Sequence, residues 1–138
     1  MRPRYYVDTS AYLCILLRET GHAGLSAELN AGQLFSSSLL VLEAERNLVR
    51  LARTGGLAPK QLQVALDRLE QDVAYFTFRD LTLDLCRMRT MPVVSTPRSL
   101  DLVHLRTAAW FHSRQPLARF VTLDAAMRAT AQELALPV

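Results

Sequence analysis

The sequence predicts an α/β fold in which a mostly parallel sheet carries helices on its faces. Short segments rich in β-forming residues alternate with longer helix-like segments along the chain. No tight hairpin signal such as Asn-Gly separates the strand-like segments. Because parallel strands need long crossover connections, this alternation favours a parallel sheet. Half of the 138 residues are hydrophobic, which is enough for a core, and we expect residues 1–138 to form a single domain.

The first half of the chain contains two expected strands, each followed by helices. In chain order these elements are a strand at 4–7 (RYYV), helices at 9–19 and 22–31, a strand at 33–38 (QLFSSS) and a helix at 39–53. Gly21 and Gly32 are expected to end the first two helices, and residues 54–56 (TGG) to stop the third.

The second half continues the same alternation. Its expected elements are a helix at 59–71, a strand at 73–78 (VAYFTF), a helix at about 80–90, a loop or short strand at 92–98, a helix at 100–113, a strand at 119–123 (RFVTL), a helix at 124–135 and a final edge strand at 136–138. Pro59 stands at a helix start, where proline is favoured. Asp80 or Thr82 begins the next helix and Pro92 closes it, while Ser99 caps the helix that follows.

Composition excludes several classes of protein. No uncharged apolar stretch is long enough to span a bilayer, and the N-terminus has no recognisable signal peptide. Cys14 and Cys86 form no CxxC pair, which suits a reduced, cytoplasmic protein better than a disulfide scaffold or a zinc site. The net charge is +3 and Lys60 is the only lysine, so arginine carries the positive charge. Such a surface is compatible with nucleic acid, although an ordinary solvated surface explains it as well.

Three aspartates lie close to the ends of expected strands. Asp8 directly follows the first strand, Asp124 directly follows the strand at 119–123, and Asp101 lies in the first turn of a helix. Ligands of parallel sheets bind beyond the carboxyl ends of the strands, so these side chains are expected at one edge. Taken singly, each aspartate is explained more readily by helix capping, because capping is so common.

Glu43 has no such explanation, because it lies inside the helix at 39–53. Together with Leu39, Arg46 and Arg50 it forms one stripe, which begins directly after the strand at 33–38. One turn into the helix, its carboxylate is expected over the same sheet edge. The alternative is a solvent-facing glutamate that pairs with Arg46 or Asn47 at helical spacing.

Four converging carboxylates repel one another unless a counter-charge is present. A hard divalent cation provides that charge, and Mg²⁺ and Mn²⁺ prefer oxygen ligands. The Cys and His clusters typical of zinc sites are lacking in the sequence. The pattern therefore predicts a magnesium-type hydrolytic site.

Four motifs in this order resemble the PIN-domain family, and within it the VapC-type ribonuclease toxins of type II toxin–antitoxin pairs. They are VDTSAYL with Asp8, SSLLVLEAERNL with Glu43, RSLDLVHLRTA with Asp101, and FVTLDAAMRATAQELALPV with Asp124. No single motif is specific, but their order and spacing agree with the family from near residue 4 to residue 138, and no acidic position is missing.

The resemblance implies a PIN-like three-layer α/β/α sandwich with a mostly parallel central sheet. The implied catalytic and metal-binding residues are Asp8, Glu43, Asp101 and Asp124. They would surround one or two Mg²⁺ or Mn²⁺ ions, and we expect Asp8 and Asp101 to be direct ligands. The implied reaction is hydrolysis of RNA phosphodiester bonds by a metal-activated water. The implied partners are an RNA substrate, a second copy in a homodimer and a small VapB-like antitoxin as inhibitor, with no membrane.

Neighbouring residues have weaker assignments. Thr9, Ser10 and Thr122 stand beside the acids and are expected either to orient them or to satisfy backbone N–H groups at helix starts. The candidates for RNA phosphate contact are Arg46 and Arg98. His104 is interpreted as a packed histidine with one hydrogen bond, with contact to metal or phosphate as the alternative. Tyr6 is interpreted as a core or dimer contact.

Other classes remain as alternatives. A haloacid-dehalogenase-like phosphatase also begins with an aspartate after the first strand, but it needs a second acid where Ser10 stands. A receiver-type domain needs a lysine near the last strand, and Lys60 is badly placed. A catalytically silent RNA-binding or scaffold module with the same fold is the non-enzymatic alternative.

Overall fold

The computed structural model describes residues 1–88, 94–96 and 98–138, and it confirms the predicted α/β fold. Its central sheet has four parallel strands in the order β3-β2-β1-β4. The strands are β1 (Arg4–Val7), β2 (Gln33–Ser37), β3 (Phe76–Arg79) and β4 (Arg119–Val121). β1 and β2, which precede the first two acidic motifs, are therefore the inner strands.

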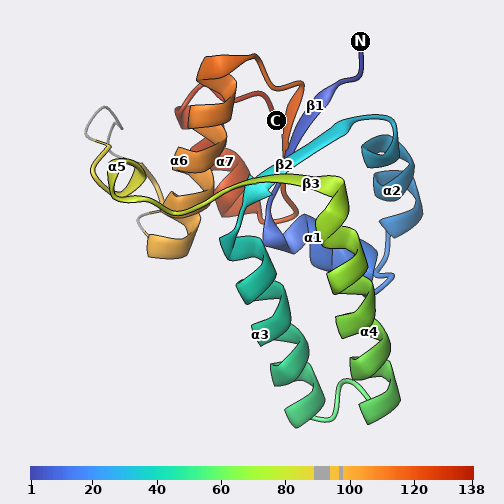
Figure 1. The fold of residues 1–138 in the computed structure, drawn as a ribbon. Helices are drawn as coiled ribbons and strands as arrows, with labels where there is room; N and C mark the ends of the chain where they lie inside the picture. The colour runs from blue at the N-terminus through green and yellow to red at the C-terminus, as the bar shows by residue number, and fades with distance from the viewer. Residues whose placement is uncertain (89–93, 97) are drawn as a thin grey trace.

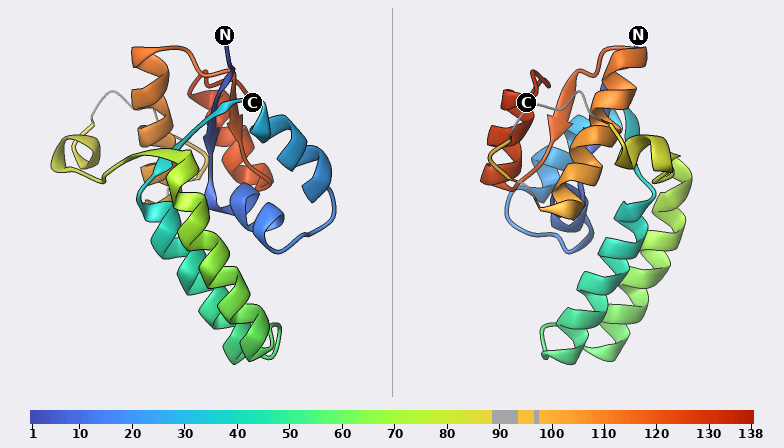
Figure 2. Two further views of the ribbon diagram at one scale, coloured as in Figure 1. Left: turned by 45° about the vertical axis from the view of Figure 1, so that its right-hand side comes forward. Right: turned by 90° about the vertical axis from the view of Figure 1, so that its left-hand side faces the viewer.

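The helices form two layers around this sheet (Figure 1). They are α1 (Thr9–Leu16), α2 (His22–Asn30), α3 (Leu39–Arg53), α4 (Pro59–Asp72), α5 (Leu83–Cys86), α6 (Ser99–Arg114) and α7 (Ala125–Glu133). α3 and α4 lie side by side and project together beyond the sheet, as both views of Figure 2 show. None of the described helices is long and apolar enough to cross a membrane.

The buried apolar residues form two separate cores, one on each face of the sheet, so the sheet lies between two layers of helices. Successive strand residues point to opposite faces of a sheet. Val7 and Val121 accordingly pack with apolar residues of α1 to α4, whereas Tyr6, Phe35 and Phe120 pack with those of α6 and α7. The inner strand β1 is buried on both faces from Tyr6 to Val7 and is apolar on both there, as is typical of parallel sheets, whereas the edge strand β3 is only partly buried.

The end of the first helix differs from the prediction. α1 stops at Leu16 because Arg18 adopts a left-handed conformation with φ of 52°. The amide of Glu19 then donates to the carbonyl of Cys14, and that of Arg18 to the carbonyl of Ile15. This is the bond pattern of a Schellman cap, and it ends the helix before Gly21.

Three other boundaries also shift. Residues 73–75 form a short 3₁₀ helix, so β3 starts at Phe76. Thr82 precedes α5, which ends at Cys86, and part of the expected helix at 80–90 lies outside the described residues, as does part of the loop at 92–98. The chain end at 136–138 is not a strand, although Phe120 donates its amide to the carbonyl of Pro137.

Candidate active site

All four predicted acids line one pocket of about 460 Å³ at the carboxyl ends of the strands. Asp8 directly follows β1, and two residues separate Asp124 from the end of β4. Glu43 lies one turn into α3, and Asp101 lies in the first turn of α6. The other lining residues are Thr9, Ser10, Leu13, Asn47, Arg98, Ser99, Leu100, His104 and Met127. The sheet topology thus brings together residues that are up to 116 positions apart in the sequence.

Asp8 is buried and fully hydrogen-bonded. Its residue is 3 % exposed, and its Oδ1 accepts from the amide of Ala11 at 3.0 Å and from the hydroxyl of Ser10 at 2.8 Å. Its Oδ2 accepts from the hydroxyl of Thr122. Burial raises the pKa of Asp8, and the hydrogen bonds from Thr122, Ala11 and Ser10 oppose this only in part. Asp8 therefore caps α1, and burial destabilises the ionised form of its carboxylate.

Glu43 is anchored through one oxygen. Its Oε1 accepts from the hydroxyl of Thr9 and from Nε2 of His104, each at 2.7 Å. Burial tends to raise the pKa of Glu43, but the bond and charge of His104, then Thr9 and Arg46, outweigh it and leave the pKa lowered. The carboxylate is thus ionised and oriented by buried donors.

The histidine continues this network into the core. Nδ1 of His104 lies 2.8 Å from the hydroxyl of Tyr6, which also accepts from the amide of Ser37 at 3.1 Å. Burial raises the pKa of Tyr6 strongly, so its phenol keeps its proton. The sequence interpretation of His104 as a packed residue with one hydrogen bond was therefore incomplete, because both ring nitrogens are engaged.

Asp101 and Asp124 are joined by a single arginine. The guanidinium of Arg98 contacts Oδ2 of Asp101 at 2.8 Å and Oδ2 of Asp124 at 3.2 Å. Thr96 also donates to Oδ2 of Asp101, and Oδ1 of Asp124 caps α7 by accepting from two amides. The Arg98 side chain is 64 % exposed, so this counter-charge lies at the mouth of the pocket.

Two of the three smaller predicted residues, Ser10 and Thr122, have both roles that the sequence left open, whereas Thr9 only orients Glu43. Ser10 donates to Asp8 and accepts from the amide of Leu123, and Thr122 donates to Asp8 and accepts from the amide of Asp124. Of the two predicted phosphate contacts, Arg98 lines the pocket. Arg46 is exposed on α3 and does not line it.

Sequence reasoning assigned no place in the site to two contributors, of which Asn47 was considered only as an alternative partner of Glu43. Asn47 lines the pocket and donates to the backbone carbonyl of Glu43. Its position one turn after Glu43 on α3 is a signal that could have indicated it. Tyr6 was missed because an apolar strand pattern gives no sign that a hydroxyl reaches a histidine 98 positions away.

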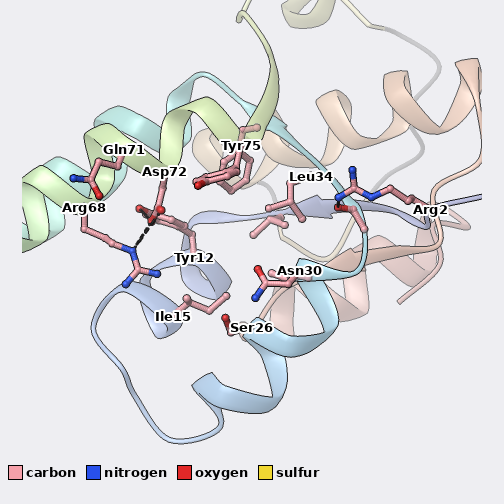
Figure 3. A pocket seen from close by; sticks show the side chains of 14 residues that line it. Arg2, Tyr12, Ile15, Ser26, Asn30, Leu34, Arg68, Gln71, Asp72 and Tyr75 are labelled. Atoms are coloured by element: carbon pink, nitrogen blue, oxygen red, sulfur yellow. Dashed lines mark hydrogen bonds and ion pairs between the residues drawn. The ribbon is translucent and has the colours of Figure 1, made fainter.

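A second pocket, of about 550 Å³, lies on the α1–α4 face toward the amino ends of β2 and β3. Figure 3 shows Arg2 and Arg68 at its opposite ends in that view. Asp72 pairs with Arg68 and accepts from the hydroxyl of Tyr12, and Arg2 donates to the carbonyl of Gly32. Its charged groups are satisfied locally and do not converge, so it is the weaker candidate for a reaction centre.

The residues of the first pocket suit a hard divalent cation by donor type, since carboxylates and hydroxyls are the oxygen ligands that Mg²⁺ and Mn²⁺ prefer. With the side chains as they lie, no three His, Cys, Asp or Glu residues in the described ranges gather closely enough to hold a metal ion. Arg98 bridges Asp101 and Asp124 instead and offsets part of their negative charge. A cation that uses all four acids therefore requires Arg98 to move away from the two aspartates.

Comparison with known proteins adds no assignment: neither a protein-family model nor a curated protein sequence matches the chain.

Proposed function

We propose that this protein is a Mg²⁺- or Mn²⁺-dependent endoribonuclease and the toxin of a toxin–antitoxin pair. The observation that carries the proposal is the meeting of four acids, Asp8, Glu43, Asp101 and Asp124, in one pocket at the carboxyl edge of a parallel sheet. These are the four acids of the motifs that resemble the VapC-type nucleases of the PIN family. Capping alone does not account for this set, because Glu43 caps no helix.

The side chains of the protein would hold the cations and orient the acids that bind them. Asp8, Glu43, Asp101 and Asp124 would hold one or two cations. A bound cation would supply an acidified water and a counter-charge for the phosphoryl oxygens. Ser10 and Thr122 keep Asp8 oriented, and Thr9 with His104 keeps Glu43 oriented. Arg98, once released from its aspartates, would present a guanidinium fork that suits an RNA phosphate.

The biological partners follow from the resemblance. We propose an RNA substrate, a homodimeric protein in the cytoplasm, and a small VapB-like antitoxin that blocks the pocket. Since Arg98 already shows that a guanidinium fits between Asp101 and Asp124, an inhibitor that carries arginine suits the same place.

A catalytically silent RNA-binding module is the second candidate. The observation that favours it is the Arg98 bridge, which gives two of the four acids a counter-charge without a metal. The two candidates differ in cation binding, because a metal-dependent nuclease gains stability from Mn²⁺ by mass action and a silent module does not.

The test is cleavage of total cellular RNA by the purified protein in Mn²⁺ or Mg²⁺, and again in EDTA. Asp8→Asn keeps the shape of the side chain but removes its charge, and we expect it to abolish cleavage, a loss of about 100-fold or more. Asp67→Asn, on the exposed face of α4, is the matched control and should cleave as wild type does.

Mass spectrometry of the same preparation shows whether a small protein inhibitor co-purifies. Metal-dependent cleavage that Asp8→Asn lacks would support the nuclease. Inhibitor-free wild-type protein that cleaves no RNA in either metal, or an Asp8→Asn variant that cleaves normally, would contradict the proposal.

A further inference from the structure

A chain of three hydrogen bonds connects the backbone of β2 to the Glu43 carboxylate. The amide of Ser37 donates to the Tyr6 hydroxyl at 3.1 Å, that hydroxyl lies 2.8 Å from Nδ1 of His104, and Nε2 of His104 lies 2.7 Å from Oε1 of Glu43. The chain crosses three elements, β2, β1 and α6, before it reaches α3. It therefore links the core to the pocket.

The chemistry of the groups sets the direction of these bonds. An ionised carboxylate only accepts, so Nε2 of His104 carries the proton that points to Glu43. When the ring is neutral, Nδ1 is an acceptor and the Tyr6 hydroxyl donates to it; when the ring is protonated, Nδ1 donates to the Tyr6 oxygen. In both cases Tyr6 keeps a lone pair for the Ser37 amide. Every bond then has one donor and one acceptor, and in the neutral ring Tyr6 favours the tautomer that donates to Glu43.

Packing makes this chain rigid. Tyr6 is 0 % exposed and His104 is 2 % exposed. The Tyr6 ring stacks on Phe120 with a centroid distance of 5.3 Å and an interplanar angle of 3°, and it meets the His104 ring edge-on. The imidazole is thus placed by close-packed neighbours that cannot easily shift.

Both donors to Glu43 use the same oxygen. Thr9 and His104 contact Oε1, while in the part of the chain that the structure describes no donor reaches Oε2. A glutamate side chain has several rotatable bonds, and fixing one carboxylate oxygen also fixes where the other points. Because Glu43 and His104 both line the pocket, the second oxygen is left for a ligand there.

We propose that Tyr6 and His104 are positioning residues that hold Glu43 by Oε1 so that Oε2 is presented to a divalent cation. The inference rests on the proposed metal-dependent nuclease and deepens it. Tyr6 does not line the pocket, so it acts on the cation only through His104 and Glu43. Partners that orient metal ligands in this way change metal affinity without touching the metal.

The experiment is calorimetric titration of the full chain with Mn²⁺, without RNA. Tyr6→Phe keeps the packed ring and removes only the hydroxyl that bonds His104. Tyr5→Phe is the matched control, because Tyr5 precedes it on the same strand, packs in the other core and has no hydrogen bond from its hydroxyl among the described residues. A purely structural hydroxyl changes the Tm of the cation-free protein but leaves the Kd for Mn²⁺ unchanged.

We expect Tyr6→Phe to bind Mn²⁺ about tenfold more weakly and Tyr5→Phe to bind it as wild type does. Equal affinities of wild type and Tyr6→Phe would overturn the inference alone. Absence of Mn²⁺ binding by the wild type would overturn the proposed metal-dependent function and, with it, the inference. The two failures are therefore distinguishable.

If Tyr6→Phe does not fold, two substitutions at His104 test the inference instead. His104→Gln retains an N–H donor for Glu43, whereas His104→Ala has none. We expect His104→Gln to keep more of the wild-type Mn²⁺ affinity than His104→Ala, as a rescue by the conservative variant. Equal losses of affinity in the two variants would show that the donor to Glu43 does not matter and would overturn the inference.

Discussion

The four acids of the pocket are held in two different ways. Asp8 and Glu43, the anchored pair, accept hydrogen bonds from the half-buried Ser10 and from four buried residues, namely Ala11, Thr122, Thr9 and His104. Asp101 and Asp124, the arginine-bridged pair, share the exposed guanidinium of Arg98. Donors of the first kind cannot leave without breaking the core, whereas Arg98 needs only to change rotamer.

Because they are held differently, the two pairs of acids have different roles in ligand binding. The anchored pair is oriented before any ligand arrives, so its ordering cost is met during folding. The arginine-bridged pair has a counter-charge that a cation can replace at the aspartates, or that a phosphate can draw away to itself. Variants of the anchored pair should therefore change mainly the free energy of unfolding. Variants of the arginine-bridged pair should change mainly the affinity for a bound ligand.

The largest difference between the pairs should appear with two matched threonine variants. Thr122 donates to Asp8 and is 1 % exposed, while Thr96 donates to Asp101 and is 6 % exposed. Thr122→Val leaves a buried carboxylate oxygen without its donor and should lower the free energy of unfolding by about 1–3 kcal/mol. Thr96→Val should cost clearly less, because Arg98 still pairs with Asp101. Urea unfolding in EDTA measures both, and equal losses would remove the distinction between the pairs.

The next effect concerns the pH dependence of stability in the anchored pair. Burial raises the pKa of Asp8 in the folded protein, so the folded state binds this proton more tightly than the unfolded state. Stability from this group is present at low pH and is lost as the pH rises from the ordinary aspartate pKa through the raised one. Asp8→Asn lacks this loss. In EDTA, its unfolding free energy relative to wild type should therefore increase from pH 4 to pH 7.

A constant difference across this pH range would show that Asp8 is not destabilised by burial. The comparison belongs in cation-free buffer, because a bound cation favours the ionised carboxylate and hides the effect. Asp67→Asn, exposed on α4, again serves as the control with no expected pH-dependent change.

Much of the fold was predictable from the sequence. The helix at 39–53 was predicted with both ends correct, because residues 54–56 (TGG) stop it and its apolar pattern is strong. The end of α1 was not predictable, since Arg18 adopts a left-handed conformation that favours glycine. At residues 73–75, β-forming residues lie in a 3₁₀ turn because α4 runs directly into it, which local propensity does not reveal.

The candidate site was predictable as a set of acids but not as a network. Strand ends and one glutamate inside a helix were enough to indicate that four carboxylates share an edge, and they line one pocket. The bond between Tyr6 and His104 depends on how α6 packs on the sheet, and no sequence spacing specifies that. The Arg98 bridge was missed because the sequence suggested a phosphate contact and gave no sign that two aspartates compete for the guanidinium.

The smallest expected effect is a change in Mn²⁺ affinity when the arginine-bridged pair loses its arginine. Arg98→Gln removes the charge that a cation must displace from Asp101 and Asp124, so Mn²⁺ should bind about two- to fivefold more tightly than to wild type. Arg53→Gln, an exposed arginine in the last turn of α3, removes the same charge away from the pocket and should leave the affinity nearly unchanged. Calorimetric titration at low and high salt compares the variants.

A gain in affinity cannot result from a damaged fold, so it would identify Arg98 as a competitor for the cation. Weaker binding would instead show that the bridge holds the two aspartates in the geometry that the cation needs, and the arginine-bridged pair would then be as preorganised as the anchored one.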